Sequence, residues 1–590
     1  MDILPRGDVV KIVESWITHF NSAIQSADSK QISRLFIDDS HWREVLSVSW
    51  FISTTSGNEQ IGVGLANGVA QYKAHNFCID TKRYPPRQIE RAGVTAIEAI
   101  LKFETAVGQG AALLRMRCDG PTPSPTQAWT FHTTLETIRG HEESTIRGQK
   151  AEPVFNRDFQ GPNWLDKRQA ASRFTDREPT VLIVGGGHAG LSVAARLGQI
   201  GVDALVVDRM NRVGDNWRLR YHGLMLHNQV HSNHLPYIPY PSIWQPYLPK
   251  DRIANFLEMY VDCMDIHFWT ETTFAGAQYD DDSQTWQAQL QKANGQTRTV
   301  KPKHIIMATS VSGSPLIPTI PTIDQYKGPV MHSSQFGDGA KWTGKNVLVI
   351  GTGTSAHDIA QDLHGNGART TMVQRSPTLV LNVEPTAQLY DGIYLGEGPS
   401  LEDRDLINTS IPLRLMLATH KRLTDQGKIH DKPILDGLEK VGFKLDYGVD
   451  GTGWPYLFRT RGGGYYFNVG CSDLIANGDI PILQNDNIAT YTATGLQTKD
   501  GRQLSYDAIV LGTGYKGHTH LLQSLFGDKV AQSVGQVWGF DTQAQELKNM
   551  WTRTAQKGLW FTGGAFSQCR AYSKYLALQI KATELNLISS

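Results

Sequence analysis

Residues 181–190 read Val181-Leu182-Ile183-Val184-Gly185-Gly186-Gly187-His188-Ala189-Gly190, an apolar strand that enters a glycine-rich turn and continues as a helix. Residues 347–356 repeat this order with Val347-Leu348-Val349-Ile350-Gly351-Thr352-Gly353-Thr354-Ser355-Ala356. A turn of this kind presents backbone N–H groups and a helix N-terminus to a pyrophosphate. One such turn is a weak signal, but two of them predict two bound dinucleotides and electron transfer between them.

The first turn carries the residues that dinucleotide binding needs. Gly185 allows the tight turn, Gly187 lets the backbone approach the pyrophosphate, and Gly190 lets the helix pack on the strand. Asp208 ends the next strand-like run, at the place where an acid binds the ribose hydroxyls. An ordinary strand–turn–helix with a surface aspartate is the alternative interpretation.

The second turn differs from the first in the residue that ends its next strand. Gly351 and Gly353 fill the first two glycine positions, and Ala356, next to Ser355, fills the third. The strand after the helix ends in Gln374-Arg375-Ser376, where an acid would repel a 2′-phosphate. Arg375 and Ser376 offer a positive charge and a hydroxyl, so we expect NADPH in preference to NADH. A surface arginine is the alternative.

The composition excludes several classes of protein. A chain of 590 residues is expected to form about two to four domains. Basic and acidic residues balance at 57 each, which gives no steering toward nucleic acid or an anionic membrane. The five cysteines include no C-x-x-C pair, which disfavours a zinc site and favours a reducing compartment. No run resembles a signal peptide or a membrane span, so we expect a soluble, cytoplasmic protein without a metal.

The first 165 residues have a different texture. Apolar residues from Val9 to Ile24 recur at helical spacing, and a second short helix is expected to start at Asp28 or Ser29. Strand-like runs come next at residues 46–54, 98–106, 111–118 and 126–136. Helices followed by an antiparallel sheet form an α+β pattern, which resembles the cone of the nuclear transport factor 2-like family. Residues 140–179 are polar and contain prolines, as in a linker.

Several strings outside the turns resemble class B flavin monooxygenases, and the YUCCA-like flavin monooxygenases among them. Residues 208–217 place Gly214-Asp215-Asn216-Trp217, a G-x-x-W pattern, after the acidic strand. Residues 220–227 and 235–241 resemble R-Y-x-x-L-x-L-H and L-P-x-x-P-F-P. Residues 326–336 resemble the fingerprint F-x-G-x-x-x-H-x-x-x-(Y/F), with its fixed positions at Gly328, His332 and Phe336. The resemblance covers residues 180–587, outside the N-terminal domain.

The resemblance implies an α/β fold with two Rossmann-like domains, one for FAD and one for NADPH, behind the N-terminal α+β domain. The expected division is 1–165 for the N-terminal domain and linker, 166–320 for the first part of the FAD domain, 321–505 for an inserted NADPH domain, and 506–590 for the rest of the FAD domain. Residues 509–515 resemble a strand that returns to the flavin domain, and residues 558–564 its last strand. A helix starting near Ser573 would point its positive end at the flavin.

The implied activity is that of an FAD- and NADPH-dependent monooxygenase that inserts one oxygen atom of O2 through a C4a-(hydro)peroxyflavin. His227 lies where relatives carry an asparagine that contacts flavin and NADP, and Asn228 could take that role, so both are candidate catalytic residues. The cofactor-binding residues expected from the motifs and the resemblance are Gly185, Gly187, Gly190, Asp208, Arg209, Gly214, Asn216, Trp217, His227, Gly351, Gly353, Ser355, Ala356, Arg375, Ser376, Gly512, Thr513, Gly514, Tyr515 and Gly563.

The substrate stays open at this point. Phe336, where strict Baeyer–Villiger enzymes carry Trp, favours N- or S-oxygenation, whereas the YUCCA-like strings favour a ketone or an α-keto acid. A disulfide reductase lacks its cysteine pair here, and a non-catalytic flavin-bound sensor or scaffold is a further alternative. We expect a small-molecule substrate, no nucleic acid partner and possible homo-oligomers. The N-terminal domain is expected to pack rather than to react, with a substrate-binding role as the alternative.

Overall fold

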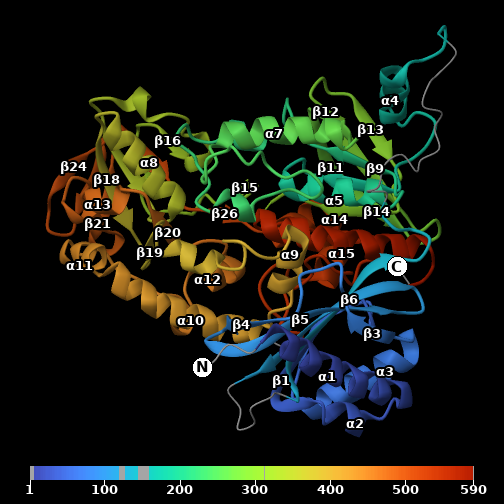
Figure 1. Ribbon diagram of the computed structural model, residues 1–590. Helices are drawn as coiled ribbons and strands as arrows, with labels where there is room; N and C mark the ends of the chain where they lie inside the picture. The colour runs from blue at the N-terminus through green and yellow to red at the C-terminus, as the bar shows by residue number, and fades with distance from the viewer. Residues whose placement is uncertain (1–4, 119–125, 144–158, 311, 542, 589–590) are drawn as a thin grey trace.

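The computed structural model describes residues 5–118, 126–143, 159–310, 312–541 and 543–588. In Figure 1 two α/β regions lie side by side, and the N-terminal α+β domain lies below them against the last helix. Along the sequence, the N-terminal domain comes first and part of the first α/β region follows. The second α/β region comes next, and the last residues of the chain complete the first.

The first α/β region is built on a parallel five-stranded sheet in the order β10-β9-β8-β14-β27. Its strands are β8 (Val181–Val184), β9 (Ala204–Val207), β10 (His267–Trp269), β14 (His304–Met307) and β27 (Leu559–Phe561). Its helices are α5 (His188–Gln199), α6 (Asp215–Arg218), α7 (Lys250–Cys263), α14 (Thr519–Val534) and α15 (Phe566–Glu584). β27 pairs with β14, which confirms the predicted last strand. A small antiparallel sheet, β11 (Thr272–Asp280), β12 (Thr285–Lys292) and β13 (Thr297–Val300), is attached.

The second α/β region is built on a parallel sheet in the order β16-β25-β17-β18-β21. Its strands are β16 (Val330–His332), β17 (Asn346–Ile350), β18 (Arg369–Gln374), β21 (Ile482–Gln484) and β25 (Ala508–Leu511). Its helices include α8 (Thr354–Gly365), α11 (Lys432–Lys440) and α13 (Cys471–Ala476), and β22 (Ile488–Thr492), β23 (Gly495–Thr498) and β24 (Gln503–Ser505) form a side sheet.

The position of β25 corrects one prediction. The resemblance implies that the strand at residues 509–515 belongs to the flavin domain, but β25 pairs with β16 and β17 of the second sheet. The chain crosses back only after it, where β26 (Tyr515–Lys516) pairs with β15 (Ser314–Pro315). An apolar strand of four buried residues fits either parallel sheet, so its pattern could not distinguish the two.

A helical segment that carries no dinucleotide motif is inserted between β18 and β21 of the second sheet. It contains β19 (Leu379–Asn382), α9 (Leu401–Thr409), α10 (Leu413–His430), α12 (Trp454–Arg461) and β20 (Tyr465–Asn468). β19 and β20 pair in parallel. Figure 1 shows α10 and α12 beside the boundary between the second α/β region and the N-terminal domain.

The N-terminal domain consists of α1 (Arg6–Ser26), α2 (Ser29–Ser33) and α3 (Asn58–Tyr72) on a seven-stranded sheet. The strands are β1 (Phe36–Val45), β2 (Ile52–Ser56), β3 (His75–Ile79), β4 (Arg87–Arg91), β5 (Val94–Glu104), β6 (Gly108–Arg117) and β7 (Ala128–Ile138). The predicted α+β pattern and the start of α2, capped by Asp28, are confirmed. The strand expected at 46–54 is confirmed only at its end, since β1 ends at Val45, residues 46–51 form a bend and β2 begins at Ile52.

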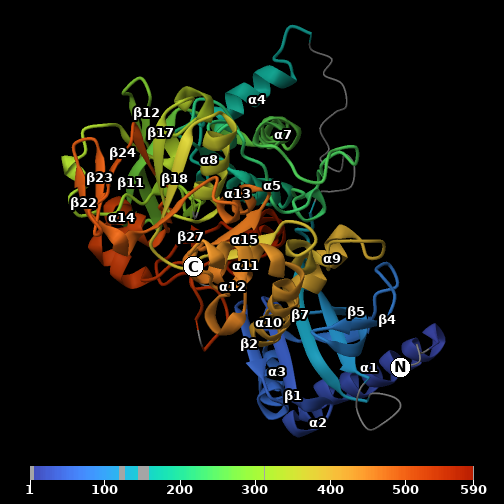
Figure 2. The same cartoon turned by 90° about the vertical axis from the view of Figure 1, so that its left-hand side faces the viewer.

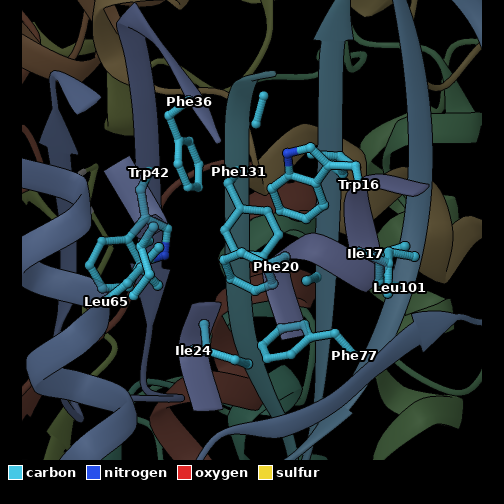
Figure 3. Close-up of a cluster of buried hydrophobic side chains, with 14 of the residues drawn as sticks. Trp16, Ile17, Phe20, Ile24, Phe36, Trp42, Leu65, Phe77, Leu101 and Phe131 are labelled. Atoms are coloured by element: carbon cyan, nitrogen blue, oxygen red, sulfur yellow. The ribbon is translucent and has the colours of Figure 1, made fainter. Parts of the chain in front are cut away.

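The interior of this domain is filled by its own side chains. Figure 3 shows Trp16 and Phe20 of α1 packed against Phe36, Phe77 and Phe131 from three strands. The Trp16 and Phe20 rings stack with centroids 4.7 Å apart, and Phe20 meets Phe131 edge-on at 5.2 Å. Aromatic pairs of this kind stabilise a core beyond their buried area. The interior between helices and sheet is therefore a packed core.

The other face of the sheet packs against the rest of the molecule. Val45 and Leu135 of the sheet join Tyr575 and Leu578 of α15 in one buried cluster. A second cluster brings Leu113 against α9. Figure 2 shows the blue strands directly below α9 and α10. The predicted linker contains α4 (Trp164–Ser172), and its residues 144–158 lie outside the described ranges.

Candidate active site

One cavity of about 1780 Å³ runs through the middle of the molecule and connects both glycine turns. It also reaches the helical segment and the outer face of the N-terminal sheet. Most of the residues predicted from the sequence line it: Gly185, Gly187, Asp208, Arg209, Asn216, Trp217, His227, Asn228, Gly351, Gly353, Ser355, Arg375, Ser376, Gly512, Thr513, Gly514, Tyr515 and Gly563. The cavity therefore joins two nucleotide turns and one further chamber in a single space.

The first turn has the geometry of a pyrophosphate site. Gly185 has φ +112°, and a Cβ there would lie 2.4 Å from the Ala308 carbonyl oxygen. Gly187 precedes the first turn of α5 and faces the Asn216 amide. The Asp208 carboxylate accepts hydrogen bonds from Gly186 N at 2.7 Å and Met210 N at 2.9 Å. Its oxygens have further lone pairs for ribose hydroxyls.

The second turn repeats this backbone. Gly351 has φ +122°, and a Cβ there would lie 2.3 Å from the Gly512 carbonyl oxygen. Gly353 precedes α8, and the space around its Cβ position is open for 4 Å. Arg375 and Ser376 are exposed on the cavity at the end of β18. The donor groups and the open approach fit a dinucleotide with a 2′-phosphate.

The remaining motif residues lie beside the cavity and do not line it. Gly190, Gly214 and Ala356 are places of close packing: a Cβ on Gly214 would lie 2.4 Å from the Ala254 carbonyl oxygen of α7. His332 Nε2 lies 2.9 Å from the Gly514 carbonyl oxygen, where the chain crosses between domains. A Cβ on Gly328 would meet the Tyr326 ring, whose hydroxyl donates to the Tyr506 carbonyl. These fingerprint contacts are structural.

His227 and Asn228 face the cavity between the turns and the chamber. Burial lowers the pKa of His227 to about 4, so its ring is neutral near pH 7. The ring meets Phe467 edge-on at 4.5 Å. The Asn228 side chain hydrogen-bonds the Asp391 carboxyl, whose pKa is raised by burial to about 6. Both candidates are therefore held where one molecule could contact both nucleotide turns and the chamber.

No sequence motif predicts the chamber itself. Its walls come from η5 (Ala387–Asp391), α10, α12 and a loop before β27, with Tyr390, His420, Trp454, Phe458 and Trp538 among the lining residues. The N-terminal sheet adds Arg43, Ile52, Glu90, Arg91, Arg115, Trp129 and Thr130. No motif marks these residues, and only the clustering of aromatic residues in 454–467 hinted at a pocket.

The helix expected near Ser573 also needs correction. α15 begins at Phe566, seven residues earlier, so its N-terminus comes directly after Gly563 and Gly564. His188 Nε2 lies 2.9 Å from the Gly564 carbonyl oxygen, and its ring stacks on Phe566 at 4.1 Å. The helix N-terminus therefore sits against the first glycine turn.

Comparisons with known proteins agree with this geometry. Residues 182–389 match the family described as pyridine nucleotide-disulphide oxidoreductase. The chain is 28% identical over 355 residues to indole-3-pyruvate monooxygenase YUCCA1 of Oryza sativa subsp. japonica, covering 60% of this chain and 81% of that protein. It is also 28% identical over 342 residues to the probable indole-3-pyruvate monooxygenase YUCCA10 of Arabidopsis thaliana, covering 58% and 82%.

Solved structures show the same fold. The open crystal structure of cyclohexanone monooxygenase has a TM-score of 0.50 at 16% identity and covers 69% of this chain and 88% of that chain. OTEMO in complex with FAD and NADP has a TM-score of 0.51 at 19% identity, with 70% and 87% covered. The chain is an FAD- and NADPH-dependent flavin monooxygenase. The resemblance to class B flavin monooxygenases is confirmed, and the family model, which begins at residue 182, does not reach the N-terminal domain.

The monooxygenase differs from a disulfide reductase despite the name of the matching family. Its five cysteines all lie in the described part of the chain, where no disulfide links them, and Cys471 and Cys569 are buried. Within the described ranges, no group of three His, Cys, Asp or Glu side chains is placed to hold a metal. Nor does any described helix have the length and apolar character that crossing a bilayer requires.

Proposed function

We propose that the substrate is a carbonyl compound, a ketone or an α-keto acid, that binds in the chamber beyond His227 and Asn228. The observation that carries the proposal is the single cavity that joins both glycine turns to that aromatic chamber. The relatives are named for indole-3-pyruvate, an α-keto acid, and the structures of the same fold are named for cyclohexanone, a ketone. N- or S-oxygenation is the alternative.

The position of Phe336 removes the main argument for that alternative. This residue favoured N- or S-oxygenation because strict Baeyer–Villiger enzymes carry Trp there. Here Phe336 is buried in the core of the second α/β region and does not line the cavity. A side chain that does not reach the reaction space cannot itself select between a carbonyl and an amine.

We propose that Gly185, Gly187 and Asp208 hold FAD, and that Gly351, Gly353 and Arg375 hold NADPH. When bound, FAD takes electrons from NADPH and activates O2. The chain's own contribution is to position the substrate and to exclude water. His227 is neutral, so it can donate a hydrogen bond to a ligand without adding a positive charge to the cavity.

Product analysis tests the reaction class. Phenylpyruvate, O2, NADPH and one proton should give phenylacetate, CO2, water and NADP⁺, with one atom of labelled O2 in the acid. Phenylacetone should give benzyl acetate and water by the same electron count. Benzylamine and thioanisole serve as nitrogen and sulfur substrates. Oxygenation of these two compounds, with NADPH use uncoupled from any carbonyl product, would contradict the proposal.

We further propose that the N-terminal α+β domain is nuclear transport factor 2-like and supports the body through its sheet. The support is the order of helices and sheet, and the burial of Tyr575 and Leu578 against Val45 and Leu135. A chain starting near Ser172 should lose solubility because this apolar surface of α15 becomes exposed. A truncated protein that is fully soluble but cannot be reduced by NADPH would contradict this role. Cytoplasmic location and homo-oligomerisation stay predictions.

A further inference from the structure

The chamber contains one half-buried arginine without an acidic partner among the described residues. Arg459 lies on α12 and lines the cavity. Its guanidinium donates to the Pro455 carbonyl oxygen of the same helix at 3.2 Å. Burial lowers its pKa, as does the nearby charge of Arg43. A half-buried cation without an acidic partner is costly to keep.

The other arginines around the chamber are neutralised. Arg43 donates two hydrogen bonds of 2.7 Å to the Glu546 carboxylate and one of 3.0 Å to the Tyr572 hydroxyl. Arg115 pairs with Glu98 at 2.9 Å. Arg570, behind the wall, pairs with Asp405. The fold thus supplies an acid to each of these structural arginines, and among the described residues it supplies none to the half-buried Arg459.

The acids that line the chamber are already engaged. Glu546 is held by Arg43, Glu90 pairs with Arg422 at 3.3 Å, and Asp391 accepts a hydrogen bond from Asn228. His420 lies near Arg459, and burial and that charge lower its pKa to about 3, so it adds no counter-charge. Its Nδ1 is buried without a hydrogen-bond partner among the described residues. The chamber therefore has unused donor capacity and a net positive end.

We propose that Arg459 binds a carboxylate of the substrate and thereby selects anionic carbonyl compounds over neutral ones. This inference rests on the proposed function and narrows it from carbonyl compounds in general to those that carry a carboxylate. The planar guanidinium offers two parallel N–H donors to a carboxylate, and such charge-assisted bonds are strong in a dry site. The Nδ1 of His420 can serve a second polar group of the same substrate.

The N-terminal domain contributes to the charge around Arg459. Arg43 of β1 reaches across the domain boundary to Glu546 and Tyr572, and its charge faces Arg459. This ion pair engages Glu546, an acid that also lines the cavity. The N-terminal domain thus holds one carboxylate of the cavity in a fixed ion pair and leaves it unavailable to other cations.

The test compares two substrates of similar shape in the full-length protein with FAD bound. Phenylpyruvate carries a carboxylate where phenylacetone carries a methyl group. Arg459→Met should raise the KM for phenylpyruvate about tenfold or more, which corresponds to about 1.4 kcal/mol. The KM for phenylacetone should stay within about twofold. Arg459→Lys should recover part of the loss. Arg414→Met is the matched control, because Arg414 is exposed on α10 and does not line the cavity.

Binding without turnover separates this inference from the proposed function. 3-Phenylpropanoate should bind the wild-type holoenzyme and lose about tenfold in affinity in Arg459→Met, whereas 3-phenylpropanamide should bind both equally. Thermal stability of Arg459→Met should be equal or higher, since an unpaired cation is removed. Equal losses for the acid and the amide, or no loss for the acid, would overturn the role of Arg459. Failure to oxygenate either carbonyl compound would overturn the proposed function alone.

Discussion

The two glycine turns have nearly the same backbone and different surroundings. Gly185 and Gly351 have φ of +112° and +122°. Gly187 and Gly353, which precede the helices, have φ of −81° and −82° with ψ of −178° at both. The shared backbone serves the shared task, the close approach to a pyrophosphate. Differences in the residues around this shared backbone therefore indicate how the two turns differ in function.

The first difference lies at the end of the second strand. Asp208 presents a carboxylate that holds Gly186 N and Met210 N, so it also fixes its own turn. In the second region Gln374 is buried there and exchanges two hydrogen bonds with the Lys444 backbone. The next residue, Arg375, is then directed to the cavity. The buried Gln374 amide therefore stands where the first region has the Asp208 carboxylate. The charged residue of the second region is Arg375, one position later.

The second difference lies at the third glycine position. Gly190 faces Ala308, and a Cβ on it would lie 3.3 Å from the Ala308 Cβ and 2.1 Å from the Gly185 carbonyl oxygen. In the second turn the larger residue is on the helix: Ala356 faces Gly512, where a Cβ would lie 2.7 Å from the Ala356 Cβ. Ala356 therefore fills the space next to Gly512, and it is also a residue compatible with NADP at this position.

The largest effect is expected from adding a methyl group at the tight glycine of each turn. Gly185→Ala and Gly351→Ala should each cost about 2–5 kcal/mol, because positive φ is strained for alanine and the Cβ meets a carbonyl oxygen. Gly185→Ala should be purified without FAD. Gly351→Ala should retain FAD and lose reduction by NADPH. Flavin absorbance and stopped-flow reduction measure this, and loss of FAD from both variants would mean that the turns do not act separately.

The backbone of these turns could be predicted well because its pattern is local. Strand, glycines, helix and the residue that ends the second strand lie within about 30 residues, so a single window contains the whole proposed site. The return of the chain to the first region was also predictable, because residues 558–564 resemble the last strand of a flavin domain and form β27 there. The exception was β25, whose four apolar residues fit either sheet.

The chamber could not be predicted because its contacts are distant in sequence. Arg43 pairs with Glu546 across 503 positions of the sequence. No sequence motif marks Arg459 as an arginine that lacks an acidic partner in the described part of the chain. β1 was missed because Phe36–Val45 carries charged residues that are buried in the fold. α3 was hidden by glycines such as Gly62, whose Cβ position lies 2.4 Å from the Ser29 carbonyl oxygen. In each case tertiary partners override the local pattern.

Arg375 should distinguish the two turns by coenzyme. Arg375→Ala removes a charge-assisted bond to the 2′-phosphate, worth about 1.5–3 kcal/mol. We expect about a ten- to hundredfold loss in kcat/KM for NADPH, with little change for NADH and unchanged FAD content. Steady-state NADPH and NADH oxidation measure it. Equal losses with both coenzymes would show that Arg375 supports the fold instead of reading the phosphate.

The exchanged alanine and glycine predict a rescue in the second turn. Gly512→Ala should cost about 1–3 kcal/mol of unfolding free energy, because its Cβ would meet the Ala356 Cβ. Adding Ala356→Gly should recover most of that loss, although a helical glycine costs up to about 1 kcal/mol. A double-mutant cycle by urea unfolding of the holoprotein measures the coupling. Additive losses would mean that the two residues do not share one packing site.

The smallest effect is a pH dependence due to a carboxyl group, which only the second turn should show. Asp358 lies on α8 and accepts a hydrogen bond of 2.6 Å from the Tyr221 hydroxyl, whereas α5 carries no acid. Burial raises the pKa of Asp358 from 3.8 to about 6. Between pH 7 and pH 5 the native state therefore takes up a proton that the unfolded state does not. This stabilises the wild type by about 1 kcal/mol as the pH falls.

Asp358→Asn keeps the acceptor for Tyr221 and removes this proton. Buried histidines, whose pKa values are lowered, make both proteins less stable in the same pH range, so the informative quantity is the difference between wild type and variant. Urea unfolding at pH 7 and pH 5 should show that difference growing by about 1 kcal/mol in favour of the wild type. Parallel pH profiles would show that Asp358 does not titrate here, and the second turn would then match the first in its response to acid.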